Sequence, residues 1–276
     1  MDVTLLGTGN PLPDPERAGA ATLVRANGQT LLFDCGRAVT MRLAGAGVGA
    51  ASLAALLITH LHSDHTWAIN DLLTTRWVSQ FADEPFPVVG PPGTAEFVDR
   101  MLAAMATDIG YRIAHHDDLT WEPRCEVTEV TEGPAFEADG VKVIAAVVDH
   151  GVVRPALSYR VEADGAAVVI SGDTCPCPGL DRLCAGADVY VQTVLRRPLV
   201  EQVPVPRFQD ILDYHSSTED AAATAARAGV RTLVLTHLIP APAPGTEQDW
   251  IDDVRRSFDG EVVVGHDLLT VSAGSG

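Results

Sequence analysis

The feature that most constrains this chain is the run His60-Leu-His62-Ser-Asp64-His65, which holds four candidate metal ligands within six residues. The apolar residues 53–59 come directly before it and predict a buried strand. Neutral imidazole and carboxylate are ligands that zinc and related divalent ions prefer. Residues two apart in an extended segment point the same way, so His60 and His62 can chelate one ion while Asp64 and His65 face a second. The alternative, a polar loop with incidental histidines, is disfavoured by this density of ligands.

Length and composition set the class of protein. The chain has 276 residues and is 46% hydrophobic, which suffices for one large or two small domains. No Pro- or Gly-rich linker divides it, so we expect a single domain spanning residues 1–276. No run approaches the roughly 18 apolar residues of a membrane span, and no signal peptide is recognisable, so no membrane partner is expected. Five cysteines are an odd and small number, which favours reduced thiols and a cytoplasmic location.

The formal charge bears on the substrate. The chain carries 37 acidic and 19 basic side chains, for a net charge of −18. Proteins that grip nucleic acid usually present a basic face, because phosphate contacts supply much of the affinity. The charge therefore argues against RNA or DNA as the main substrate.

Hydrophobic periodicity predicts a mixed α and β chain. Strands are expected at residues 3–9, 21–25, 30–33, 53–59, 126–130, 141–148, 157–161, 167–170, 188–194, 232–236 and 261–264. Helices are expected at residues 37–46, 67–80, 94–107, 181–186, 217–228 and 246–257. Residues 196–213 contain three prolines and are expected to be irregular.

A His or Asp follows the end of several other predicted strands, as His60 does. These residues are Asp34, His150, Asp173 and His237. Each one alone is weak evidence, because a turn residue or a satisfied core histidine would look the same. Strand ends at one edge of a sheet are nevertheless where a fold gathers distant residues around a reaction centre.

Together these motifs resemble the metallo-β-lactamase superfamily. Two further motifs, Leu6-Gly-Thr-Gly9 and Tyr214-His215-Ser216-Ser217, are similar to its ribonuclease Z and arylsulfatase-like branch. The resemblance covers about residues 3–265. It implies an α/β (α+β) fold built as a four-layer αββα sandwich.

The resemblance also implies a dinuclear zinc site. His60, His62 and His150 would hold one Zn²⁺, Asp64, His65 and His237 the other, and Asp173 would bridge both. Asp34 would support the ligands from behind. Oxygen-reducing diiron relatives usually have Glu at the position of His62, so this histidine favours zinc hydrolysis. Mn²⁺ or another divalent ion would also suit the ligand set.

A mechanism follows from that ligand set. A hydroxide bridging the two ions would attack the substrate. Asp64 would accept a proton from the bridging water, and His215 would donate a proton to the leaving group. The alternative for His215 is a neighbour of a helix cap with no catalytic part.

Three departures from the ribonuclease Z pattern guide the functional hypothesis. The interval from His150 to Asp173 is too short for the protruding arm that many of those enzymes use to grip tRNA. Thr193 stands where many relatives carry a Glu that orients the catalytic histidine; Asp210, Asp213 or Glu219 would have to replace it. The third departure is the acidic charge. We therefore predict a dinuclear zinc hydrolase of a small ester, with phosphodiesters ahead of sulfate esters, carboxylic esters and lactones, and with tRNA disfavoured.

Two alternatives remain open: a tRNA 3′-processing endonuclease of the ribonuclease Z type, and a metal-stabilised binding protein without catalysis. A homodimer is implied by analogy alone. Several residues have undecided roles, either at the site or elsewhere: Arg154, Arg196 and Arg197 as contacts for an anionic substrate, Cys175 and Cys177 near the metals, and Trp67, Trp77 and Phe208 in the pocket.

Overall fold

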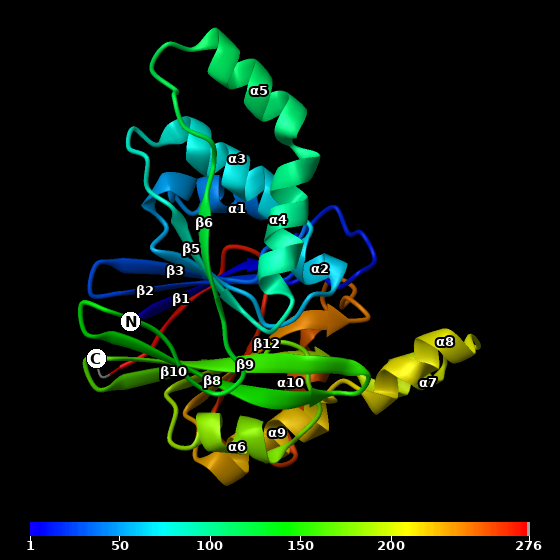
Figure 1. Cartoon of the computed structure of the whole chain (residues 1–276). Coiled ribbons are helices and arrows are strands. Elements are labelled where there is room, and N and C mark those ends of the chain that lie inside the picture. The colour runs from blue at the N-terminus through cyan, green and yellow to red at the C-terminus, as the bar shows by residue number, and fades with distance from the viewer. Residues whose placement is uncertain (275–276) are drawn as a thin grey trace.

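Two seven-stranded sheets pack face to face, with helices on the outer side of each (Figure 1). This computed structural model describes residues 1–274. The predicted αββα sandwich is confirmed. The last two residues of the predicted 1–276 domain lie outside the described part of the chain.

The first sheet positions Asp34 and the histidine run. Its strands, in spatial order, are β14 (Thr270–Ser272), β1 (Asp2–Gly7), β2 (Ala21–Ala26), β3 (Gln29–Phe33), β4 (Ala55–Leu57), β5 (Phe86–Gly90) and β6 (Cys125–Glu129). The strands from β3 to β6 pair in parallel. The carboxyl ends of β3 and β4 therefore open at the same edge, where Asp34 and His60 follow.

The second sheet supplies the remaining candidate ligands. Its strands, in spatial order, are β13 (Glu261–Val264), β12 (Thr232–Ile239), β11 (Val189–Leu195), β10 (Ala166–Ile170), β9 (Val153–Ala163), β8 (Val141–His150) and β7 (Gly133–Ala138). Strands β10 to β13 are parallel, whereas β7 to β10 are antiparallel. The β9–β10 hairpin fills the short interval between His150 and Asp173, as the sequence predicts.

Apolar side chains from both sheets interdigitate between them. Leu31 and Leu57 of the first sheet and Val168 of the second belong to one buried cluster. The Tyr159 hydroxyl donates a hydrogen bond to the Ile58 carbonyl at 2.7 Å, which ties the second sheet to the segment that leads into His60. The two halves of the future site are thereby fixed relative to each other by buried contacts.

Helices cover both outer faces. Those on the side of the first sheet are α1 (Val39–Gly45), α3 (Ile69–Ser79), α4 (Thr94–Ala104) and α5 (Ala106–His115), with the 3₁₀ turn η1 (Ala50–Ser52). The short helix α2 (Ser63–Thr66) lies beyond the strand ends and carries Asp64 and His65 (Figure 1). Those over the second sheet are α6 (Pro178–Cys184), α9 (Thr218–Ala228) and α10 (Glu247–Arg255). Within residues 1–274, none of the helices is both long and apolar enough to cross a membrane.

A third group of helices extends away from one end of the sandwich (Figure 1). It consists of α7 (Arg197–Glu201), α8 (Pro206–Gln209) and the 3₁₀ turn η2 (Asp210–Asp213). The expectation that residues 196–213 are irregular was therefore wrong. Pro198 and Pro206 lie in the first turns of α7 and α8, where a missing N–H costs nothing.

Other predicted elements need smaller corrections. Strand β4 covers only three residues, so His60 lies in a loop three residues after the strand. Helix α5 and strands β5, β7 and β14 were not predicted. Helix α9 is confirmed, with a capping box between Ser217 and Asp220 at its start and Gly229 at φ 68° after its end.

Candidate metal centre

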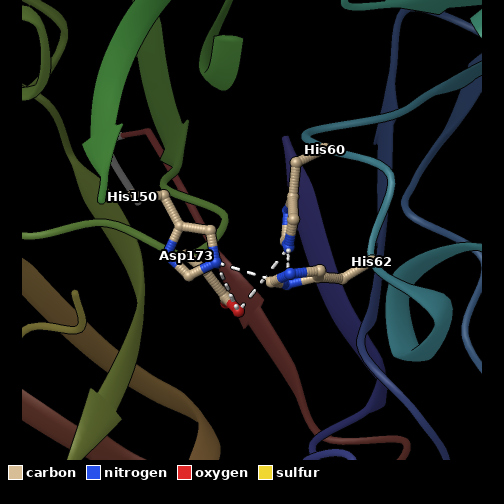
Figure 2. A group of neighbouring side chains, drawn as sticks. All are labelled: His60, His62, His150 and Asp173. Carbon is tan, nitrogen blue, oxygen red and sulfur yellow. Dashed lines mark hydrogen bonds and ion pairs between the residues drawn. The ribbon is translucent and has the colours of Figure 1, made fainter. Parts of the chain in front are cut away.

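The predicted ligand residues converge between the two sheets at one end of the sandwich. Figure 2 shows His60 and His62 approaching from the first sheet, with His150 and Asp173 facing them from the second. Their ligand atoms form a group within 4.8 Å of one another, and so do those of Asp64, His65 and His237. The structure thus brings all seven residues together.

The first group is built around the ring nitrogens of three histidines. His60 Nε2 lies 3.0 Å from His62 Nδ1, and His150 Nε2 lies 3.3 Å from the same atom. Asp173 Oδ2 lies 3.8 Å from His60 Nε2 and 3.9 Å from His150 Nε2. A single cation between these four atoms could contact all of them.

The second group, Asp64, His65 and His237, lies beside Asp173 of the first. His237 Nε2 lies 3.0 Å from Asp64 Oδ2, and His65 Nε2 lies 3.7 Å from that oxygen. Asp173 Oδ2 lies 3.3 Å from His65 Nε2 and 3.7 Å from His237 Nε2. One carboxylate oxygen therefore faces both groups, as a bridging ligand must.

Hydrogen bonds on the far side of three rings set their orientation. His65 Nδ1 donates to Asp34 Oδ2 at 2.8 Å, His60 Nδ1 faces Thr59 Oγ1 at 3.0 Å, and His150 Nδ1 donates to the Tyr214 carbonyl at 2.9 Å. Thr59 Oγ1 itself donates to Asp34, so it accepts from His60. Each bond leaves the Nε2 lone pair of its ring directed at the centre.

Asp34 has an unusual backbone that suits this supporting place. It lies in the left-handed region at φ 59°, which Asp tolerates better than most residues. Its Oδ1 accepts the Thr59 N–H at 2.8 Å while its Oδ2 holds His65. One carboxylate therefore links the two ends of the histidine run.

Burial and charge give the protonation states that a metal site needs. Burial lowers the pKa of His60, His62 and His150, which keeps these rings neutral. Burial raises the pKa of Asp173, but the charges of His237 and His65 outweigh it and hold that pKa well below its usual range. Asp173 therefore remains a carboxylate despite being buried.

The second group is more strongly polarised. Burial raises the pKa of Asp64, but the hydrogen bond from His237 and the charge of His65 lower it to about 2. Burial lowers the pKa of His65, yet Asp173 and Asp34 raise it well above its usual value. The carboxylates of Asp34, Asp64 and Asp173 all lie within 4 Å of a His65 ring nitrogen and favour positive charge at this point, which a divalent cation would supply.

Unpaired buried atoms support the same conclusion. Asp173 Oδ1 and His65 Nε2 are buried and make no well-directed hydrogen bond, although His65 Nε2 is near Asp173. Leaving such groups without a partner is costly. The donor set and these orphaned atoms fit a divalent metal ion.

Local backbone features deliver two of the ligands. The prediction that His237 follows the end of its strand was wrong. His237 lies within β12, at φ 50°. The pairing of β11 with β12 shifts register there, so a bulge turns the ring toward the centre. Gly172 allows the close approach of the loop carrying Asp173, because a Cβ at this position would lie 2.7 Å from Thr59 Cβ.

His215 lies beside the ligand cluster. Its Nε2 is 3.2 Å from Asp173 Oδ2, and its Nδ1 donates to the Ile211 carbonyl at 3.3 Å. None of the carboxylates expected to replace the missing Glu contacts the ring in the described structure. Glu219 instead accepts from Thr218 and lies near Arg256. A backbone carbonyl therefore takes the orienting role.

A pocket of about 480 Å³ opens onto the centre. His62, Asp64, Asp173, His215 and His237 form its floor. One wall comes from the loop at residues 9–17. We call the other the outer wall: residues 197–213, whose lining side chains are Val200, Val203, Arg207, Phe208 and Ile211. Apart from Phe208, the outer wall was not predicted, because residues 196–213 were expected to be irregular. The position of Pro198 and Pro206 in the first turns of two helices was the available signal.

The undecided residues fall mostly outside the pocket. Arg196 pairs with Asp253 and Asp249, and Arg197 lies 3.7 Å from Asp220. The side chain of Trp67 is exposed, whereas that of Trp77 is buried and donates to the Trp121 carbonyl. Cys175 Sγ lies 3.5 Å from the Asp213 carbonyl, and neither it nor Cys177 joins the ligand groups. Only Phe208, among the three aromatic candidates, lines the pocket.

Comparisons with known proteins agree with this geometry. A family model described as a β-lactamase superfamily domain matches residues 29–238. The chain is 55% identical over 273 residues to the ribonuclease Z of Mycobacterium bovis (strain BCG / Pasteur 1173P2), covering 98% of both chains. The metallo-β-lactamase fold protein YhfI from Bacillus subtilis superposes with a TM-score of 0.76 at 21% identity, over 99% of this chain and 98% of that one. Human tRNase Z, short form, gives a TM-score of 0.70 at 24% identity over 99% of both chains.

The bacterial relative corrects the substrate prediction. A small ester with tRNA disfavoured was inferred from the net charge, the short interval after His150 and Thr193. A relative with 55% identity along almost the whole chain is named ribonuclease Z, so that inference was wrong. Net charge summed over a chain does not report the local field at a pocket.

Proposed function

This chain belongs to the ribonuclease Z family within the β-lactamase superfamily and is a metal-dependent hydrolase of ester bonds; we propose that its substrate is precursor tRNA, which it cleaves at the 3′ end. The identity of 55% over 98% of both chains carries the proposal. The converging ligand cluster supports it, because phosphodiester hydrolysis needs an activated water and a stabilised leaving group. A cytoplasmic location and a single domain over residues 1–276 belong to the same proposal.

We further propose that the cofactor is a pair of zinc ions. His60, His62 and His150 would hold one, Asp64, His65 and His237 the other, and the carboxylate of Asp173 would serve both. The nitrogen-rich donor set supports zinc over magnesium, which prefers oxygen ligands. When bound, the two ions would lower the pKa of a water molecule toward about 7 and neutralise charge on the phosphate.

The protein's own groups would then move the protons. Asp64 is ionised and faces the centre, so its carboxylate can accept a proton from the attacking water. His215 lines the pocket with Nε2 at the centre, and the Ile211 carbonyl fixes its Nδ1 as the donor. In that orientation a protonated His215 can donate from Nε2 to the departing 3′ oxygen, while Asp173 stabilises the charged ring.

A cleavage assay with defined ends tests the proposal. The zinc-loaded protein is incubated with a 3′-extended precursor tRNA, and the products are mapped to the nucleotide. We expect one cut at the 3′ end of the mature sequence, loss of cleavage after chelation, and loss in Asp64→Ala. Scattered cleavage, or an unchanged rate in Asp64→Ala, would overturn it.

A further inference from the structure

Ion pairing leaves few free arginines in this acidic protein. Twelve of the 19 Lys and Arg side chains pair with a carboxylate. Within residues 1–274, two of the remaining arginines, Arg17 and Arg207, line the pocket. Arg17 is held in place, because its Nη1 donates to Thr8 Oγ1 and to the Gly265 carbonyl.

Arg207 is different, because its guanidinium has neither an ion pair nor a hydrogen bond in the described structure. It is exposed on α8, and its Cζ lies 5.8 Å from the ring centroid of Phe208. Phe208 also lines the pocket and remains 40% exposed. The ring of Phe208 and the unpaired guanidinium of Arg207 therefore lie side by side in the wall of the pocket.

The surroundings of this pair indicate what it would bind. Val200, Val203 and Ile211 make the rest of the outer wall apolar. Besides Asp64 and Asp173, the pocket contains one carboxylate, Asp14, whose Oδ1 accepts the Glu16 N–H. A ligand that suits this pocket carries a flat apolar face beside an anionic ester. A nucleotide combines both.

We propose that Phe208 and Arg207 form a nucleotide subsite: the ring of Phe208 stacks on the base next to the scissile phosphate, and Arg207 pairs with a neighbouring phosphate. This inference rests on the proposed function, because the nucleotide belongs to the RNA being cut. Helices α7 and α8 extend from the end of the sandwich (Figure 1). The ring of Phe208 on α8 lines the pocket and is 40% exposed, so a strand that enters the pocket can reach it.

Two small substrates test the subsite apart from tRNA. Methyl p-nitrophenyl phosphate and thymidine 5′-(p-nitrophenyl phosphate) share a leaving group, and only the second has a base. We expect Phe208→Ala to raise KM for the thymidine ester about 10-fold, with kcat little changed, and Phe208→Trp to restore it. For the methyl ester, which has no base to stack on the ring, the change in KM should be several-fold smaller in both variants. Phe81→Ala, which removes an exposed ring on the first half of the chain, is the matched control.

Precursor tRNA then tests the subsite in the proposed reaction. Placing an abasic nucleotide beside the cleavage position should raise KM for the wild-type protein about 10- to 100-fold but add little in Phe208→Ala. Arg207→Gln should reduce the slope of log Kd against log salt by about 1, whereas Arg182→Gln, an exposed arginine paired with Glu132, should not.

The outcomes separate the two proposals. If the wild-type protein cuts precursor tRNA but the abasic nucleotide raises KM as much in Phe208→Ala as in the wild type, the subsite is wrong and the proposed function stands. If the wild-type protein hydrolyses the thymidine ester through Phe208 but does not cut precursor tRNA, the proposed function fails while the base subsite stands. Equal KM values of wild type and Phe208→Ala for the thymidine ester would overturn the subsite.

Discussion

The ligand cluster and the outer wall face the same pocket but are built in opposite ways. Cluster residues such as His60 and His237 are 0% and 1% exposed, and three rings are fixed by hydrogen bonds from behind. On the outer wall, Phe208 is 40% exposed and Arg207 has no polar partner in the described structure. The cluster is rigid because an error there would leave charges buried. The outer wall can change without that penalty, so we associate it with substrate choice and the cluster with chemistry.

The largest effect is expected from the shared carboxylate. Asp173→Asn removes one negative charge from the point where both ligand groups meet, so we expect loss of bound metal and a fall in hydrolysis of about 10⁴-fold for every substrate. Metal content by elemental analysis and rates on methyl p-nitrophenyl phosphate measure both effects. Asp118→Asn, an exposed carboxylate far along the chain, is the control. If Asp173→Asn keeps two metal ions and most of its activity, Asp173 does not join the two ligand groups into one centre.

His215 should separate proton transfer from metal binding. His215→Ala removes the proposed proton donor but none of the seven ligand candidates, so kcat should fall about 10²- to 10⁴-fold while metal content stays the same. The loss should shrink for substrates with a p-nitrophenolate leaving group, which needs no proton. His115→Ala, an exposed histidine at the end of α5, is the control. An equal loss for alkoxide and p-nitrophenolate leaving groups would contradict the donor role.

The same contrast explains what the sequence could predict. The dense run at residues 60–65 is a strong local pattern and gave four of the seven ligand candidates. His150, Asp173 and His237 are weak signals one at a time, and the family resemblance was needed to add them. The sequence offered Phe208 as a pocket candidate but not the rest of the outer wall. Val200 and Val203 look like any apolar residues, and Pro198 and Pro206 look like helix breakers when the first turn is not known. Phe208 can bind a ligand because its ring is exposed in the pocket. That exposure depends on how the chain packs and is not visible in the sequence.

Two further errors have the same origin in three-dimensional context. The orienting partner of His215 is the Ile211 carbonyl, and backbone groups are the same at every position of a sequence. The charge of −18 suggested a small substrate, but most basic side chains are already paired, so the field at the pocket depends on the few that are not. The net charge of a sequence does not tell which basic side chains form ion pairs with carboxylates that are distant in the chain.

Asp34 tests how far the rigidity of the cluster depends on its support. Asn tolerates the φ of 59° and can still accept from Thr59, but its amide cannot accept from His65 Nδ1 with both groups correctly placed. We expect Asp34→Asn to weaken metal affinity about 10- to 100-fold, measured by competition with a coloured chelator. At saturating metal, kcat should recover. Unchanged affinity would mean that packing alone orients His65.

The smallest effect is expected at the helix that begins just after His215. Ser217 caps α9 by accepting the Asp220 N–H at 3.1 Å and donating to Asp220 Oδ2 at 2.8 Å. Ser217→Ala should lower the free energy of unfolding by about 1 kcal/mol and Tm by roughly 2–4 °C, measured by calorimetry of the metal-loaded protein. Activity should not change, because the contacts of His215 to Ile211 and Asp173 do not involve the cap.

Ser257→Ala, at an exposed site after α10, is the control. A fall in kcat out of proportion to the loss of stability would show that the cap helps to place His215, and that cluster and outer wall are coupled through α9.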